Sequence, residues 1–289
     1  MYKIAILGCE NFHAVSFLNS ITQDKDFSDI EVLGVYSDEE EAMENLHNKF
    51  GVPVMKNPDE LKGKVDGVIV TARRGGSHLP MVKPYLEDGI PVFIDKPITK
   101  DIADAEEMID LFKKYGNQFS GGSVMKHCQG TKLMREKVKN LDAEKVLGGM
   151  VCAPIMMGSP YDGFFFYSHH LVEMICIVFG MFPKSVSAYR TKNGVTAVIR
   201  YEDYDVTGVF TEYSEAELYT LTAITKSGIH TLDSMYTDEA FKDELKSFTD
   251  LLKGGKSECS PEEFIAPVYI LNAINDSLNS GKEEFINWK

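Results

Sequence analysis

Residues 2–13 read Tyr2-Lys3-Ile4-Ala5-Ile6-Leu7-Gly8-Cys9-Glu10-Asn11-Phe12-His13, a short aliphatic run that ends at a glycine. Short continuous apolar runs suit parallel β-strands that are covered on both faces. A helical pattern follows, because Ala14, Phe17, Leu18 and Ile21 are spaced three to four residues apart. The stretch therefore predicts a strand, a tight turn and a helix, which is the start of a βαβ unit.

The same alternation continues to about residue 121. Strand-like runs lie at residues 31–36, 65–70 and 91–94 and begin again at 118, and helical patterns lie at 38–50, 78–88 and 101–115. Strands that alternate with helices of about 10–15 residues indicate βαβ units and a parallel sheet. Right-handed crossovers then give an open, doubly wound sheet. We expect residues 1–121 to form one α/β domain of this kind.

The pattern changes after about residue 122. Helical patterns at 131–140 and 168–180 precede strand-like runs at 185–190, 195–201, 206–213, 218–225 and 229–232, and two helices close the chain. Asn193-Gly194 between two such runs is a strong hairpin signal. We expect residues 122–289 to form an α+β domain with a mainly antiparallel sheet and one open face. An open apolar face is often a subunit interface, so we interpret it as the contact of a homo-oligomer.

Composition limits the possible partners. The 289 residues include 30 Lys and Arg against 44 Asp and Glu, which gives a formal net charge of −14. Binding to nucleic acid or to an anionic membrane needs clustered basic surface, so neither is expected. No run approaches the roughly 18 apolar residues that span a bilayer. Five scattered cysteines favour reduced thiols. We expect a cytoplasmic protein with a small-molecule ligand.

The turn after the first strand has the position of a dinucleotide-binding fingerprint, whose glycines let the backbone approach a pyrophosphate. Of the three glycine places only the first, Gly8, is kept, while Glu10 and His13 occupy the second and third. Glu10 would bring a carboxylate close to a diphosphate, and a protonated His13 would offset part of that repulsion. A plain strand-to-helix turn is the alternative. The candidate cofactor contacts here are Gly8, Glu10, Asn11, Phe12 and His13.

Two further strand ends carry candidate cofactor contacts. Ser37 and Asp38 follow the second strand, where an acid that accepts the ribose 2′-hydroxyl favours NAD over NADP; the alternative is that Asp38 caps a helix. Thr71-Ala72-Arg73-Arg74-Gly75-Gly76-Ser77-His78 follows the third strand. Its arginine pair suits an anionic group, and a surface salt bridge is an equal alternative.

Asp95-Lys96-Pro97 follows the strand at residues 91–94. A lysine at the carboxyl edge of a strand faces the ligand crevice, where a low dielectric constant can lower its pKa for acid–base work. Pro97 fixes the backbone as the chain leaves the strand. Out of context, the tripeptide is an ordinary turn.

The chain resembles the Gfo/Idh/MocA oxidoreductases, which have a Rossmann-type nucleotide-binding half. Asp95-Lys96-Pro97 is similar to the Glu-Lys-Pro motif of that family, the loop that ends at His78 to its Thr-to-His loop, and residues 162–173 to its Asp-x-x-x-His-x-x-Asp segment. The resemblance covers essentially the whole chain. It implies that Lys96 and His170 hold the reacting alcohol or ketone and that NAD or NADP exchanges the hydride. Tyr167 and His169 are further candidate substrate contacts, and the position of Asp38 favours NAD as the cofactor. The residues implied to contact the cofactor include Thr71, Arg73, Arg74, His78, Asp95, Lys96 and Pro97.

Two departures from the family pattern keep a second function open. Phe166 stands where the family often has an aspartate, and Tyr167, His169 or Glu173 are the possible substitutes. The glycine turn is also degraded. Adjacent histidines on a helix point about 100° apart, so we expect no metal site at His169 and His170. We expect an NAD(P)-dependent oxidoreductase acting on a small polyol, sugar or related hydroxy compound; the alternative is a non-catalytic ligand sensor with the same fold.

Overall fold

The computed structural model describes residues 1–141, 145–212 and 218–289, which form two compact units. The first unit comprises Met1–Thr99, Ala103–Gly122 and Phe241–Pro261. The second comprises Lys100–Ile102, Ser123–Ala240 and Glu262–Lys289. The domain boundary that the sequence predicts after residue 121 lies next to the border between the units at residue 122. Residues 241–261, however, belong to the first unit and not to the second. Tyr213, which the sequence assigns to the end of a strand, lies outside the described residues.

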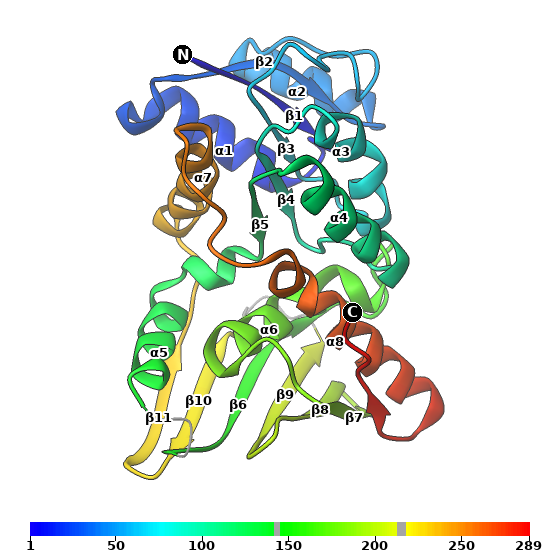
Figure 1. The fold of residues 1–289 in the computed structure, drawn as a ribbon, viewed down its shortest axis with the longest axis vertical. Coiled ribbons are helices and arrows are strands. Elements are labelled where there is room, and N and C mark those ends of the chain that lie inside the picture. The colour runs from blue at the N-terminus through cyan, green and yellow to red at the C-terminus, as the bar shows by residue number, and fades with distance from the viewer. Residues whose placement is uncertain (142–144, 213–217) are drawn as a thin grey trace. The chain divides into compact units, whose positions relative to one another are not determined.

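The first unit contains a five-stranded parallel sheet with the order β2-β1-β3-β4-β5 (Figure 1). Its strands are β1 (Tyr2–Leu7), β2 (Ile30–Tyr36), β3 (Gly67–Val70), β4 (Val92–Asp95) and β5 (Phe119–Gly122). Its helices include α1 (Phe12–Gln23), α2 (Glu40–Phe50), α3 (His78–Leu86) and α4 (Ile102–Tyr115), with short 3-10 turns at Lys25–Phe27 and Gly75–Ser77. Every residue of β3 and β4 is buried, which explains their continuous apolar runs. The predicted doubly wound α/β fold is confirmed.

A segment from near the C-terminus covers one face of this sheet. Helix α7 (Asp238–Leu252) lies with α1 on the left of the sheet in Figure 1, and α3 and α4 lie on the right. Leu245 and Phe248 of α7 are fully buried in the same core as Phe17 of α1 and Phe93 of β4. A side chain at Gly67 would meet Phe248 within 2.9 Å, so the glycine leaves room for this helix.

The second unit contains a seven-stranded sheet with the order β11-β10-β6-β9-β8-β7-β12. Its strands are β6 (Val146–Ile155), β7 (Ser185–Thr191), β8 (Gly194–Arg200), β9 (Asp205–Glu212), β10 (Thr220–Thr225), β11 (Gly228–Asp233) and β12 (Glu284–Phe285). Its helices are α5 (Gln129–Lys139), α6 (Phe164–Phe179) and α8 (Pro261–Ser280), with a 3-10 turn at Val124–His127. The sequence did not predict β6, which pairs parallel to β9, so the sheet is mixed while its other neighbouring pairs are antiparallel.

One face of this sheet is buried and the other is partly open, as the alternation predicted. Helix α6 covers the buried face, because a side chain at Gly149 would meet the ring of Phe179 and one at Gly208 would meet Leu171. On the opposite face Met150 and Ile224 are each 39% exposed. The fold class expected for the second half is therefore confirmed, and β6 is a strand of its sheet that the sequence did not predict.

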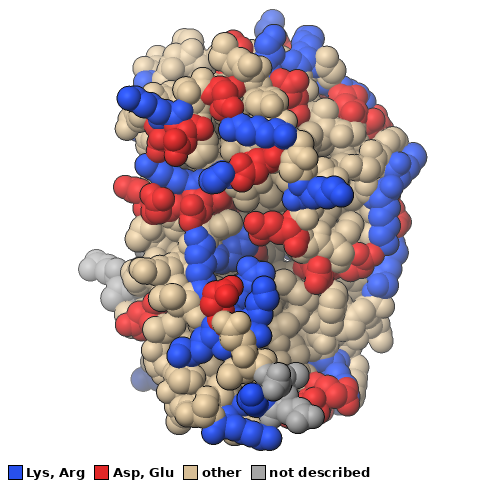
Figure 2. All heavy atoms as spheres, turned by 60° about the vertical axis from the view of Figure 1, so that its left-hand side comes forward, with Lys and Arg blue, Asp and Glu red and all other residues tan. Residues whose placement is uncertain are grey.

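The surface drawn in Figure 2 carries acidic and basic side chains intermixed, without one continuous basic tract on that face. The acidic side chains on this face therefore do not form a single patch. Among the described residues, no helix combines the length and the apolar character that crossing a membrane requires.

Candidate functional site

The turn after β1 makes a close backbone contact with the loop after β3. Gly8 has φ +69°, and a Cβ there would lie 2.3 Å from the backbone nitrogen of Ala72. The hydroxyl of Thr71 also donates to the carbonyl oxygen of Gly8 at 3.0 Å. This position needs glycine for both its conformation and its space, as the first place of a dinucleotide turn does.

We expect Gly8→Ala to lower the free energy of unfolding by about 3 kcal/mol, because left-handed strain and overpacking against immovable backbone add together. Gly63→Ala is the matched control, since Gly63 has φ +72° and nothing within 4 Å of its Cβ position. It should cost only the conformational strain of about 1 kcal/mol. Urea denaturation measures both values. Equal losses in the two variants would contradict the close contact.

Glu10 ties together the loops that follow three adjacent strands. Its carboxylate accepts a hydrogen bond from the Ser37 hydroxyl at 2.7 Å and another from the Arg73 backbone amide at 2.9 Å. Ser37 follows β2 and Arg73 follows β3, so the carboxylate is held toward these two loops.

The start of α1 fits an anionic group. Asn11 is the N-cap, its side chain accepts from the His13 amide, and the first turn contains no acidic residue. Amide groups at such a helix start attract phosphate. The carboxylate of Glu10 bonds to other loops, so the repulsion expected from the sequence is not directed at this helix start. We conclude that Gly8, Asn11 and the first turn of α1 fit the pyrophosphate of a dinucleotide.

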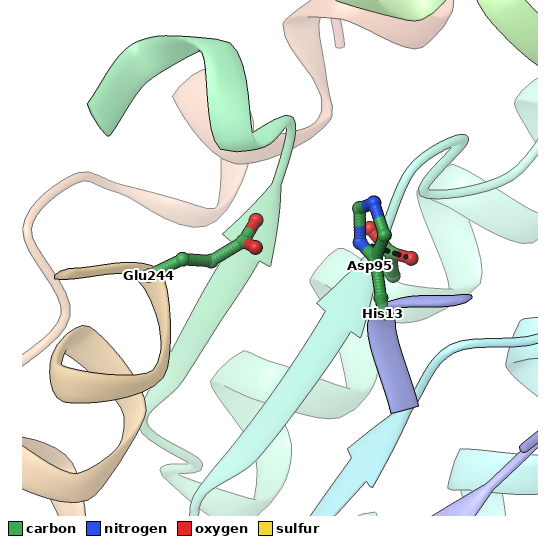
Figure 3. A group of neighbouring side chains, drawn as sticks. All are labelled: His13, Asp95 and Glu244. Carbon is green, nitrogen blue, oxygen red and sulfur yellow. Dashed lines mark ion pairs between the residues drawn. The ribbon is translucent and has the colours of Figure 1, made fainter. Parts of the chain in front are cut away.

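His13 joins α1 to the end of β4. Its Nδ1 lies 2.9 Å from Oδ2 of Asp95, as Figure 3 shows. Asp95 is fully buried and also accepts from the Asn11 side chain and from the Lys96 amide. Burial opposes ionisation of Asp95, but the charge and hydrogen bond of His13 and the charge of Lys96 outweigh it, so its pKa lies below the ordinary value.

Lys96 is buried next to these groups, with an exposed fraction of 4%. Burial lowers the pKa of its ammonium, while the negative charges of Asp95 and Glu244 act in the opposite direction. Glu244 comes from α7 and points toward His13 and Asp95 in Figure 3. A lysine with a lowered pKa at the carboxyl end of a parallel strand releases its proton more readily than an exposed lysine does, which suits acid–base work.

His13, Asp95 and Glu244 are also the described residues whose ligand atoms could hold a cation, since these atoms lie within 4.8 Å of one another. Two observations favour a charge network without a metal. The oxygens of Asp95 already accept from Asn11 and from the Lys96 amide. The Lys96 amine also interacts electrostatically with both carboxylates, so in its protonated form it supplies the positive charge that a metal would bring.

The other predicted cofactor contacts of the first unit occupy different environments. Asp38 is exposed and accepts from the Tyr36 hydroxyl at 2.9 Å, and α2 has Glu39 rather than Asp38 as its N-cap. Phe12 is 61% exposed and packs edge-on against Phe241. The guanidinium of Arg73 lies 3.9 Å from Glu39. Arg74 is exposed, and Pro97 follows a cis peptide bond.

His78 is completely buried, which favours a structural role over a direct cofactor contact. Its Nε2 lies 2.7 Å from the carbonyl oxygen of Ala72, and its Nδ1 lies 3.2 Å from that of Ile98. Burial lowers the pKa of the ring, although these carbonyls favour its protonated form. The histidine therefore joins the loops that follow β3 and β4.

In the second unit, His170 lies in a buried polar cluster. Its Nδ1 is 2.7 Å from the hydroxyl of Ser123, and its ring packs edge-on against Tyr167. The amide of Ser123 donates to Oε2 of Glu173 at 2.6 Å. Ser123 therefore connects Glu173 to His170 by hydrogen bonds. Phe166, which stands in the place of the family aspartate, contacts the rings of Tyr161 and Tyr167.

Glu173 is the charged centre of this cluster. Its carboxylate lies 3.1 Å from Nε2 of His169 and 3.3 Å from the ammonium of Lys126. Burial acts to raise the pKa of Glu173, but these neighbours and the Ser123 amide lower it below the ordinary value. His169 is fully buried and paired with Glu173, so it helps to hold the Glu173 carboxylate in place within the cluster.

The structure brings Asn11, His13, Asp95 and Lys96 together in one unit and Ser123, His169, His170 and Glu173 in the other. Lys96 belongs to the first unit and His170 to the second, so their convergence stays a prediction. The sequence analysis missed Glu244, Ser123 and Lys126. The sequence pattern could have indicated Glu244, because it lies three residues after Phe241 and so faces the apolar side of α7. For Ser123 and Lys126 the sequence offers no indication beyond their position after β5.

Residues 2–123 match the family model GFO_IDH_MocA, described as an oxidoreductase family with an NAD-binding Rossmann fold. A search of curated proteins finds no match.

Solved structures resemble the fold over nearly the full length. A probable dehydrogenase from Thermotoga maritima has a TM-score of 0.85 and 17% identity, covering 98% of both chains. Myo-inositol 2-dehydrogenase from Lactobacillus plantarum has a TM-score of 0.84 and 16% identity, covering 99% of both. GenD2 from gentamicin A biosynthesis, solved with NAD, has a TM-score of 0.84 and 15% identity, covering 99% of this chain and 96% of that one. Residues 2–123 therefore resemble the Gfo/Idh/MocA family of oxidoreductases with an NAD-binding Rossmann fold, and the whole chain shares its fold with these solved structures.

Proposed function

We propose that the protein is an NAD-dependent dehydrogenase that oxidises a secondary alcohol of a small polyol, sugar or related compound, or reduces the matching ketone. The observation that carries this proposal is the burial of Lys96 at the carboxyl end of β4. Ligands of open parallel sheets bind at that edge. Structural relatives that are inositol dehydrogenases support the polyol class.

The residues of the chain would supply the proton transfer. Gly8, Asn11 and the first turn of α1 would hold NAD, which would supply the hydride acceptor when bound. The hydroxyl proton would pass to the amine of Lys96 in its neutral form or to the His170 ring, leaving a ketone. The lowered pKa of Lys96 raises its neutral fraction. His170, held by Ser123, is the candidate residue of the second unit for orienting the hydroxyl oxygen.

A non-catalytic sensor is the second candidate. Phe166 in place of an aspartate favours it, because its phenyl ring contacts Tyr161 and Tyr167 and supplies no proton acceptor. A sensor would bind the dinucleotide and a polyol without a change in the redox state of either.

Two measurements on the full chain separate these functions. Titration with NADH, followed by its fluorescence, tests cofactor binding. Incubation with NAD and a panel of inositols, sugars and sugar acids, followed at 340 nm, tests turnover. The dehydrogenase requires both signals, and binding without turnover over the whole panel would support the sensor. Absence of dinucleotide binding would contradict both functions.

Two further parts of this proposal concern the setting of the enzyme. We place it in the cytoplasm, in agreement with five cysteines that are all described and form no disulfide. We also propose a homo-oligomer that buries the partly exposed sheet face with Met150 and Ile224. Light scattering coupled to size-exclusion chromatography tests the second statement, and a monomer at micromolar concentration would contradict it.

A further inference from the structure

A carboxylate from an unexpected loop lies beside Ser37, the first residue after the second strand. In open α/β folds that bind NAD, an acidic side chain at the end of the second strand accepts hydrogen bonds from the adenosine ribose. Here the first residue after β2 is Ser37, which has no carboxylate. The Ser37 hydroxyl donates to Glu10, so a carboxylate from the β1 turn reaches the same place.

Asp38 is the competing carboxylate, but its interactions direct it elsewhere. It is exposed, and its Oδ1 accepts from the Tyr36 hydroxyl at 2.9 Å. Glu10, in contrast, is partly buried and anchored at both oxygens, by Ser37 and by the Arg73 amide. A carboxylate has about four acceptor positions, and these two donors use about half of them. The rest can accept from ribose hydroxyls.

The surrounding charges also distinguish the two cofactors. NADP carries a 2′-phosphate that would approach the Glu10 carboxylate. Arg73 holds Glu10 through its backbone amide, and its guanidinium lies 3.9 Å from Glu39, so part of its positive charge is already balanced. Two like charges in contact repel each other strongly at a partly buried site.

We propose that Glu10 is the residue that selects NAD over NADP, accepting from the adenosine ribose hydroxyls and repelling a 2′-phosphate. The inference rests on the proposed cofactor function. It gives a role to the side chain that replaces the second glycine of the turn, and it assigns the selection to the β1 turn rather than to the acid that follows β2.

The test compares the dissociation constants of NADH and NADPH, measured by fluorescence titration at fixed ionic strength. We expect the unmodified protein to bind NADH at least about tenfold more tightly than NADPH. Glu10→Gln keeps the size of the side chain and removes its charge, and it should bring the ratio of the two constants about tenfold closer to one. A tenfold change corresponds to about 1.4 kcal/mol.

Two further variants make the test specific. Glu44→Gln removes the same charge from an exposed position on α2 and should leave the ratio unchanged. Asp38→Asn tests the competing carboxylate, and a change as large as that of Glu10→Gln would overturn the proposal. Preference of the unmodified protein for NADPH would also overturn it, with the dehydrogenase function left standing. Failure to bind either dinucleotide would remove both the inference and the proposed function.

Discussion

Replacement of Lys96 by methionine should lower kcat/KM by about 10²- to 10⁴-fold, the range that a positioned acid–base group typically contributes. Methionine keeps an unbranched side chain of similar length in a site where Lys96 is only 4% exposed. The variant loses the amine that would accept the hydroxyl proton, while the backbone amide that bonds to Asp95 remains. The assay follows NADH at 340 nm with the polyol that gives the highest turnover.

The pH profile separates a catalytic amine from a structural one. Burial lowers the pKa of Lys96, so oxidation by the unmodified protein should rise with pH as the neutral amine forms. This dependence should disappear in Lys96→Met. Lys83→Met is the control, because Lys83 is exposed on α3 and paired with Glu107. An unchanged kcat/KM in Lys96→Met, with normal NADH affinity and thermal stability, would remove Lys96 from the mechanism.

The fold of the first half of the chain could be predicted well, because strands that are buried on both faces of a sheet are continuous apolar runs in the sequence. Strands β1, β3 and β4 each contain a short apolar run, and Gly51 ends α2 with φ +70° as a C-cap should. The sequence also predicted that Ser37 and Asp95 follow strand ends, where cofactor contacts are expected.

Tertiary contacts explain what the sequence pattern did not predict. Strand β6 contains Gly148 and Gly149, which lower strand propensity. The reason for Gly149 lies in α6, because a Cβ there would be 2.3 Å from the Phe179 ring. In the same way, the apolar stripe of α7 predicts a buried face but does not specify the parallel sheet as its partner. The packing of segments that are distant in the sequence determines which surface α7 covers.

In the candidate site, too, the sequence predicted the positions of residues but not their partners. Motif positions identify Glu10 and His13 as departures from a glycine pattern, and they predict repulsion of a phosphate. The structure shows that each departure has a partner, Ser37 and the Arg73 amide for Glu10 and Asp95 for His13. Such pairings depend on side-chain conformation across different loops, so no spacing rule in a single sequence predicts them.

The buried cluster of the second unit predicts a large and pH-dependent loss of stability on removal of one charge. Glu173→Gln should lower the free energy of unfolding by about 3 kcal/mol at pH 7, because the ammonium of Lys126 and the ring of His169 lose their buried anion. Glu136→Gln, an exposed substitution on α5, should cause no measurable change. Urea denaturation followed by circular dichroism gives both values.

The sign of the pH dependence follows from the lowered pKa of Glu173. A carboxyl group whose pKa is lower in the folded state stabilises the protein at pH values above its unfolded pKa, which is about 4.3 for glutamate. That stabilisation is lost as the pH falls through the folded value. The difference between the unmodified protein and Glu173→Gln should therefore be largest near neutral pH and shrink below about pH 4. A difference that grows on acidification would mean that Glu173 is protonated in the folded protein, and the ion pairs with Lys126 and His169 would then be wrong.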